Sequence, residues 1–125
     1  MGDAWIAYAH EVGIDPGEAA DVEAFHEIAH LTVPPGNYFF VGKGAVAMRA
    51  SETTVWLRVH TRPHEGDVTP VTVIDGYSPF ALTGIVSLGR MSRISVECRT
   101  EEQPVSIDYF RLVVTQVESL HWPSE

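Results

Sequence analysis

Short runs of alternating apolar and polar residues, separated by turn-forming residues, fill most of the chain. The clearest alternation lies in residues 54–61, where Val55, Leu57 and Val59 alternate with larger or polar side chains. Apolar residues at every second position are typical of a strand with one face in a core and the other in solvent. The pattern predicts an all-β protein, an antiparallel β-sandwich of seven to eight strands.

The expected elements follow from the positions of these runs and of the turns between them. We expect strands at residues 5–12, 25–33, 38–48, 54–61, 68–74, 80–88, 91–99 and 105–117. A short helix is expected at residues 16–23, because Asp15 and Pro16 suit the cap and first position of a helix. Pro35 and Gly36 fit the two central positions of a type II turn. Residues 25–33 are therefore expected to form the first arm of a hairpin.

The last expected strand differs from the others because it is apolar on both faces. Simple alternation places Phe110, Leu112 and Val114 on one face, and Ile107, Tyr109, Val113 and Val117 on the other. A strand of an antiparallel sandwich needs only one buried face, so the second face should meet another layer or another subunit. From the residues alone, another subunit and a cover from the chain's own N-terminal segment or C-terminal tail are equal alternatives.

The sequence His26-Glu27-Ile28-Ala29-His30 is a literal H-E-x-x-H motif. On a helix, it would place two imidazoles on a zinc ion with Glu27 as the base. On a strand, alternation turns Glu27 away from both histidines and destroys that arrangement. The strand is favoured because Leu31-Thr32-Val33 leads directly into a proline pair, which leaves little room for a helix beyond His30. A small zinc metallohydrolase remains the alternative.

No other motif assembles an active site. Gly42-Lys43-Gly44 resembles part of a phosphate loop, but it lies inside a strand pattern without a following helix, which indicates a close backbone approach or a bulge. We therefore predict a protein that is not an enzyme, with no catalytic residue, no metal ligand and no cofactor.

Charge and cysteine content narrow the class of protein further. The 17 acidic and 8 basic residues give a net charge of -9, which disfavours nucleic acid as a partner. Seven acidic residues precede the first basic one, so residues 1–23 are assigned to an acidic N-terminal segment, 24–120 to the main domain and 121–125 to a tail. Cys98 is the only cysteine, and alternation places its thiol with Ile94 in the core.

Nothing in the sequence predicts export or membrane insertion. The start lacks the basic and apolar regions of a signal peptide, and no apolar run approaches the roughly 20 residues that span a bilayer. We expect a soluble chain.

Two segments together resemble the small C1q/TNF-like jelly roll. They are Leu31-Thr32-Val33-Pro34-Pro35-Gly36-Asn37-Tyr38-Phe39-Phe40-Val41 and Asp108-Tyr109-Phe110-Arg111-Leu112-Val113-Val114. Between them, residues 80–86 and 94–99 are similar to small bacterial and phage members. The resemblance implies a compact homotrimer whose closing strands pack toward the three-fold axis. It gives the outer residues of the last strand a role as the oligomer interface, namely Ile107, Tyr109, Val113 and Val117.

Free-standing domains of this kind resemble small virion proteins of tailed phages. The expected function is that of a trimeric minor tail or tail-tip component, located in the virion, that binds a host-surface ligand or other virion proteins. A capsid decoration protein of the same fold is the alternative. Candidate loop contacts are Arg62, His64, Tyr77 and Glu101, and candidate aromatic anchors are Trp5, Trp56 and Trp122.

Overall fold

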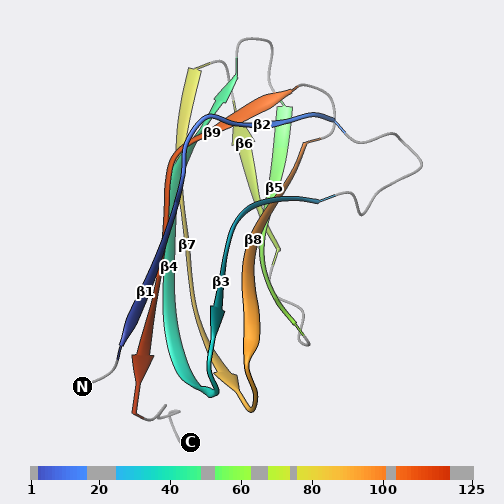
Figure 1. Cartoon of the computed structure of the whole chain (residues 1–125). Helices are drawn as coiled ribbons and strands as arrows, with labels where there is room; N and C mark the ends of the chain where they lie inside the picture. The colour runs from blue at the N-terminus through green and yellow to red at the C-terminus, as the bar shows by residue number, and fades with distance from the viewer. Residues whose placement is uncertain are drawn as a thin grey trace, which may run out of the picture.

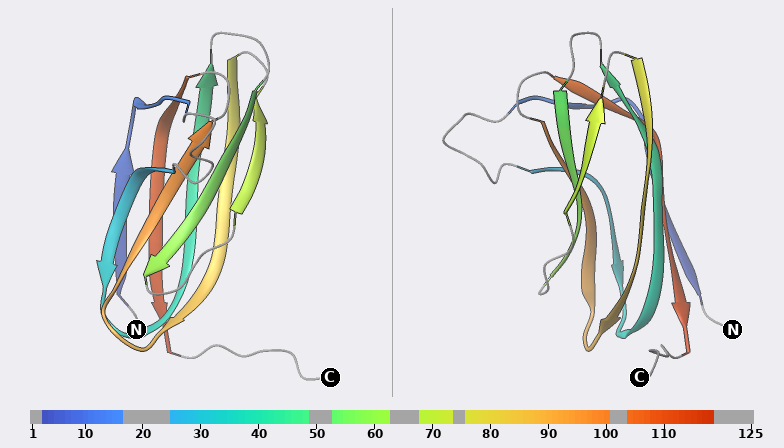
Figure 2. Two further views of the ribbon diagram at one scale, coloured as in Figure 1. Left: turned by 90° about the vertical axis from the view of Figure 1, so that its right-hand side faces the viewer. Right: turned by 180° about the vertical axis from the view of Figure 1, so that it is seen from behind.

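The computed structural model describes residues 3–16, 25–48, 53–62, 68–73, 76–100 and 104–118, which form two antiparallel sheets packed face to face (Figures 1 and 2). The first sheet contains β1 (Ala4–Ala9), β2 (Val12–Ile14), β4 (Gly36–Met48), β7 (Gly76–Leu88) and β9 (Val105–Val117). The second contains β3 (His26–Val33), β5 (Thr53–Arg62), β6 (Val68–Val73) and β8 (Ser92–Thr100). All regular structure in the described residues is strand, so the predicted all-β sandwich is confirmed.

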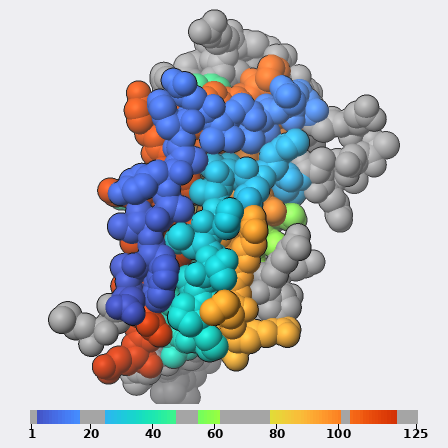
Figure 3. Space-filling view, viewed as in Figure 1, coloured from blue at the N-terminus to red at the C-terminus, as the bar shows by residue number. Residues whose placement is uncertain are grey.

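The strand orders are β1-β9-β4-β7 and β3-β8-β5-β6. β1 and β2 both pair with β9, one after the other, so they act as one interrupted edge strand and the sandwich has eight strand positions. Residues 4–14 of the acidic N-terminal segment are thus part of the sheet. In Figure 3 they run along one side of the molecule, where β1 also contacts β3 of the opposite sheet. The helix expected at residues 16–23 lies, beyond Pro16, outside the described residues.

The tight connection between β3 and β4 carries the chain from one sheet to the other. β3 pairs with β8, whereas β4 pairs with β7 and β9, so the reversal at Pro34-Pro35 joins two layers (Figure 2). The predicted hairpin is therefore wrong, although the reversal itself forms. The φ of Gly36 is 158°, far from the roughly 80° of a type II turn. Proline supplies no backbone donor to a ladder, which suits a connection that leaves one sheet for another.

The core lies between the sheets and is built from alternate residues of the facing strands. Its largest fully buried side chains include Tyr38, Leu57, Ile94, Phe110 and Leu112. The alternation predicted for residues 54–61 is confirmed, because all three aliphatic residues of that run are buried. The buried position of the Cys98 thiol is also confirmed, and burial raises its pKa to about 12.

The first sheet bends where three neighbouring strands become irregular together. β9 has a bulge at Tyr109–Phe110 opposite Gly44 of β4, and the break between β1 and β2 at His10–Glu11 faces the same level of β9. In Figure 1 both the edge strand and β9 turn across the top of the sandwich at this level. The bulge confirms the interpretation of the glycine-flanked Lys43, since a Cβ at Gly44 would lie 3.2 Å from the Phe110 ring.

The bulge changes which residues of β9 face inward. Before it Val105 and Ile107 point into the core, and after it Phe110, Leu112 and Val114 do. Simple alternation had placed Ile107 on the outer face with Tyr109 and Val113, and this placement is wrong because one extra residue reverses the phase of the strand. Ile107 is fully buried.

Candidate functional site

The outer face of the sheet formed by β1, β9, β4 and β7 is called the apolar face here. Six large hydrophobic residues of the described chain are strongly exposed, and five of them lie on this face. The five are Ile6, Tyr8, Phe39, Ile85 and Tyr109. Met91, at the connection between β7 and β8, is the sixth. Exposed apolar residues gathered on one face mark an interaction surface more strongly than residues scattered singly.

Strand register joins these residues into continuous rows. Ile6 of β1 lies opposite Val113 of β9, and Val113 lies opposite Val41 of β4. One step along the sheet, Phe39 of β4 lies opposite Ile85 of β7. Cross-strand neighbours on one face are close enough for their side chains to pack, so the rows form one patch. Of the predicted interface residues, Tyr109, Val113 and Val117 belong to strand positions on this face, whereas Ile107 does not.

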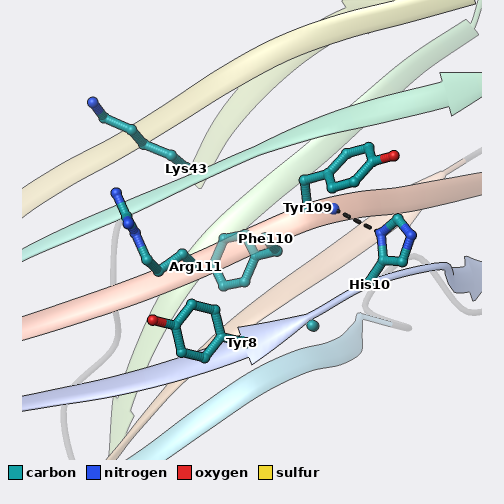
Figure 4. A pocket seen from close by; sticks show the side chains of 7 residues that line it. Tyr8, His10, Lys43, Tyr109, Phe110 and Arg111 are labelled. Atoms are coloured by element: carbon teal, nitrogen blue, oxygen red, sulfur yellow. Dashed lines mark hydrogen bonds between the residues drawn. The ribbon is translucent and has the colours of Figure 1, made fainter.

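A pocket of about 490 Å³ lies on the same face, at the level of the bulge (Figure 4). It is lined by Tyr8, Ala9, His10, Lys43, Tyr109, Phe110 and Arg111. Lys43 of β4 and Arg111 of β9 are directly opposite each other in the register. Neither side chain forms an ion pair with a carboxylate of the described residues. Sequence analysis missed this cation pair because the two residues are far apart along the chain.

His10 holds the bulge in place. The Tyr109 amide, which the bulge removes from the strand ladder, donates a 3.1 Å hydrogen bond to His10 Nδ1, and the two rings lie 4.3 Å apart between centroids. His10 Nε2 lies 3.5 Å from Glu11 Oε1. Tyr109 and Glu11 both adopt left-handed backbone conformations, with φ of 53° and 55°. Such conformations are costly for residues other than glycine and occur preferentially at functional sites.

The outer face of the second sheet, called the polar face here, holds the H-E-x-x-H residues. β3 is a strand, as predicted, and carries a bulge between Glu27 and Ala29. The bulge buries both Ile28 and Ala29 and leaves Glu27 and His30 exposed on the same side. Glu27 Oε2 lies 3.2 Å from His30 Nδ1, so the expected separation of Glu27 from His30 is wrong. The extra residue again changed the phase of the strand.

Glu27 is bound by partners on β8. Arg93 Nη2 donates to both carboxylate oxygens at 2.6 and 2.8 Å, and the Ser95 hydroxyl donates at 2.9 Å. The pKa of Glu27 is lowered from its ordinary value of 4.5. Partial burial alone would raise this pKa, but its effect is outweighed by the hydrogen bonds from Arg93 and Ser95 and by the charges of Arg93 and His30. This carboxylate is thus held ionised by structural partners.

The remaining polar face is a ladder of cations, rings and one carboxylate. Arg58 Nε lies 2.6 Å from Glu97 Oε1, and its guanidinium lies 4.0 Å from the centre of the Phe25 ring. Arg99 lies 4.4 Å from the centre of the Trp56 ring. Cations over aromatic faces are attracted by the ring quadrupole. Trp56 is therefore occupied by a contact within the chain.

The H-E-x-x-H motif lies on a strand and not on the helix that the zinc metallohydrolase alternative requires. The described residues contain no group of three or more His, Cys, Asp or Glu side chains placed to hold a metal ion. The catalytic geometry of H-E-x-x-H requires both histidines one helical turn apart, and residues 26–33 are extended.

The candidate loop and anchor residues are only partly described. Arg62 and Tyr77 lie within β5 and β7, where only the backbone is described. His64, Glu101 and Trp122 lie outside the described residues. Trp5 is half-buried and packs edge-on against Tyr38, with ring centroids 5.7 Å apart. Trp5 thus anchors β1 to the core.

In the part of the chain that the structure describes, no helix has the length and apolar character needed to cross a membrane. The strand orders, in which most consecutive strands lie in opposite sheets, define the class as a jelly-roll sandwich, the class expected from the resemblance.

Solved structures of the same class show this fold. A chain of the infectious bursal disease virus Gx strain superposes with a TM-score of 0.69 at 8% identity, covering 93% of this chain and 33% of that one. The VP2 subviral particle of infectious bursal disease virus gives a TM-score of 0.69 at 8% identity, covering 92% and 33%. This chain thus spans one third of the length of those viral chains. The Eiger TNF protein from S. frugiperda gives a TM-score of 0.61 at 11% identity, covering 99% and 98%.

No protein-family model matches the sequence, and no curated protein matches it significantly. At these identities the structural likeness establishes the fold alone.

Proposed function

We propose that this chain is a non-enzymatic structural and binding subunit of a virus particle, and that it assembles as a homotrimer through its apolar face. The observation that supports this most directly is that, among the described residues, five of the six strongly exposed large hydrophobic side chains lie on one sheet face. A monomer that left this patch in water would forgo the free energy of burying it. Covering the patch with copies of the same chain satisfies every subunit equally.

The fold and the site both support this assembly. The TNF protein from S. frugiperda has the same sandwich over almost its whole length, and the viral chains place such a sandwich in virus particles. In the resemblance to C1q/TNF-like domains, the closing strand faces the three-fold axis. β9 is that strand here, and Val113 lies near the middle of the apolar rows.

Within the virion, we propose a minor tail or tail-tip component that attaches to a host surface or to neighbouring virion proteins. Its candidate contacts are His64 and Glu101, together with Arg62 and Tyr77, which were expected in loops but lie at the last position of β5 and near the start of β7. The second candidate is a capsid decoration protein, which the viral particle chains among the structural neighbours favour. Quantitative proteomics of the particle that carries the protein distinguishes them, because decoration requires hundreds of copies and a tail component only a few.

Native mass spectrometry tests the trimer. The expected species has three times the chain mass of 13.8 kDa, about 41 kDa. Val113→Asp introduces a charge into the centre of the apolar rows, and we expect it to convert the trimer to a monomer that keeps its β-sheet circular dichroism.

The matched control is Thr32→Asp, which adds the same charge at an exposed position of β3 on the polar face. This variant should remain a trimer. A wild-type monomer, or a trimer that survives Val113→Asp, would contradict assembly through the apolar face.

A further inference from the structure

The Lys43–Arg111 pair is unusual in a protein with this charge. Like charges directly opposite each other on a sheet destabilise it, and these two cations are cross-strand partners. The chain carries a net charge of -9, yet no described carboxylate pairs with either of them. On the polar face, by contrast, Arg58 and Arg93 each have a carboxylate within 2.6 Å. The two exposed cations are therefore available to an anion that carries its own carboxylate.

The walls of the pocket indicate what carries that anion. Tyr8 and Tyr109 are each 72% exposed and line the same pocket as the cations. Tyr8 is the cross-strand neighbour of Arg111, and Figure 4 shows Tyr109 farther along β9, beside His10. Tyrosine offers a flat apolar face together with a hydroxyl that donates or accepts a hydrogen bond. A pyranose ring has the matching chemistry, with C–H groups on its faces and hydroxyls around its edge. The volume of about 490 Å³ lies within the usual range for small-molecule sites.

The strained backbone conformation of Tyr109 lies in the same pocket. The left-handed conformation of Tyr109 turns this residue outward at the bulge, and the hydrogen bond to His10 fixes that geometry. The ring position is therefore set in advance, and a ligand does not have to order it.

We propose that this pocket binds an acidic sugar, with Lys43 and Arg111 binding its carboxylate and with Tyr8 and Tyr109 packing against its ring. Arginine suits a carboxylate because its planar guanidinium can donate two parallel hydrogen bonds. All the residues come from one chain. The site spans β1, β9 and β4 at the level of the bulge, and Tyr8 and Tyr109 also belong to the apolar face, so sugar binding in the trimer requires that the contact between copies leave this part of the face open.

Isothermal titration calorimetry with three probes tests the proposal. The probes are D-glucuronate, D-glucose as its neutral counterpart, and acetate as a carboxylate without a ring. We expect glucuronate to bind to the wild-type protein at least about tenfold more tightly than either of the others, because only glucuronate engages both the cations and the rings.

Three variants assign that binding to the pocket. The double variant Lys43→Gln and Arg111→Gln should weaken glucuronate binding by about tenfold or more, and its thermal stability should not fall, because a like-charge repulsion is removed. Tyr8→Thr should weaken glucuronate binding several-fold and leave acetate unchanged. Arg90→Gln, which removes an exposed cation at the connection between β7 and β8, is the control and should bind as the wild type does.

The proposal is overturned if glucose or acetate binds as tightly as glucuronate, or if the double variant keeps full binding. It is also overturned if the wild-type trimer binds no glucuronate but the Val113→Asp monomer does, since a neighbouring copy would then fill the pocket. That last result would leave the proposed trimer standing. Conversely, a monomeric wild type that binds glucuronate would overturn the trimer and support the sugar site.

Discussion

The two outer faces of the sandwich differ in how their charged and apolar side chains are partnered. On the polar face, Arg58 and Arg93 are held by carboxylates, and aromatic rings lie against the guanidinium groups of Arg58 and Arg99. On the apolar face, large hydrophobic side chains are exposed and two cations have no described carboxylate partner. On the polar face these charged groups find partners within the chain, whereas on the apolar face Lys43 and Arg111 have no carboxylate partner among the described residues.

The difference shows that exposure alone does not identify a functional surface. The H-E-x-x-H residues stand out in the sequence, yet in the structure Glu27 is engaged by Arg93, Ser95 and His30. Lys43 had no predicted role, but it lies in a pocket opposite a second cation, Arg111. The incomplete interactions, and not the conspicuous motif, locate the candidate site.

The sharpest test of the comparison uses two neighbouring residues of β9 that face opposite ways. Leu112→Ala should lower the free energy of unfolding by about 2–5 kcal/mol at any protein concentration, because Leu112 is fully buried. Val113→Ala, on the apolar face, should have an effect that depends on protein concentration, because the contact it weakens lies between subunits. Urea denaturation at several protein concentrations measures both. Equal, concentration-independent losses would show that Val113 acts only within one chain.

A smaller effect is expected on the polar face. Glu27→Gln removes the charge that Arg93 and Ser95 bind, and we expect a loss of about 1 kcal/mol in the free energy of unfolding, limited by the partial exposure of both charged partners. The control is Glu118→Gln, an exposed residue whose side chain has no recorded partner in the described residues. Chemical denaturation at pH 7 compares them. If the two variants lose the same stability, the Glu27 network contributes nothing specific.

The smallest effect is the pH dependence of that network. The folded-state pKa of Glu27 lies below its ordinary value of 4.5, so the carboxylate stabilises the fold above pH 4.5 and this contribution is lost as the pH falls through the folded-state pKa. The stability difference between wild type and Glu27→Gln, about 1 kcal/mol at pH 7, should therefore shrink toward zero below pH 4.5. Denaturation curves from pH 7 to 3 measure it. A difference that stays constant over this range would contradict the role of the ionised carboxylate.

Much of the fold was predictable because the strands are amphipathic. The range predicted for β9 agrees with the structure, and the inward alternation of β5 and the buried Cys98 were also correct. The pairing of the strands was harder to predict from the sequence. β3 and β4 follow each other across a proline pair and were expected to form a hairpin, but the sandwich places them in different sheets.

The candidate site was predicted only in part, for a local geometric reason. Alternation correctly placed Val113 on the outer face of β9, but it misplaced Ile107, because the extra residue at Tyr109 shifts the phase. The same kind of error misplaced Glu27 relative to His30 on β3. A bulge leaves little trace in a hydrophobic pattern, since it depends on where the partner strand bends.

The alternation of side chains by itself determined most of the strands and the doubly apolar character of the last strand, because alternation is a local property, and the jelly-roll class was implied by the resemblance. Only the tertiary structure decided which strands pair, where the bulges change the facing of a residue, and that Lys43 and Arg111 meet beside two tyrosines. These features depend on contacts between residues far apart along the chain, and register and sheet packing fix such contacts only when the whole sandwich forms.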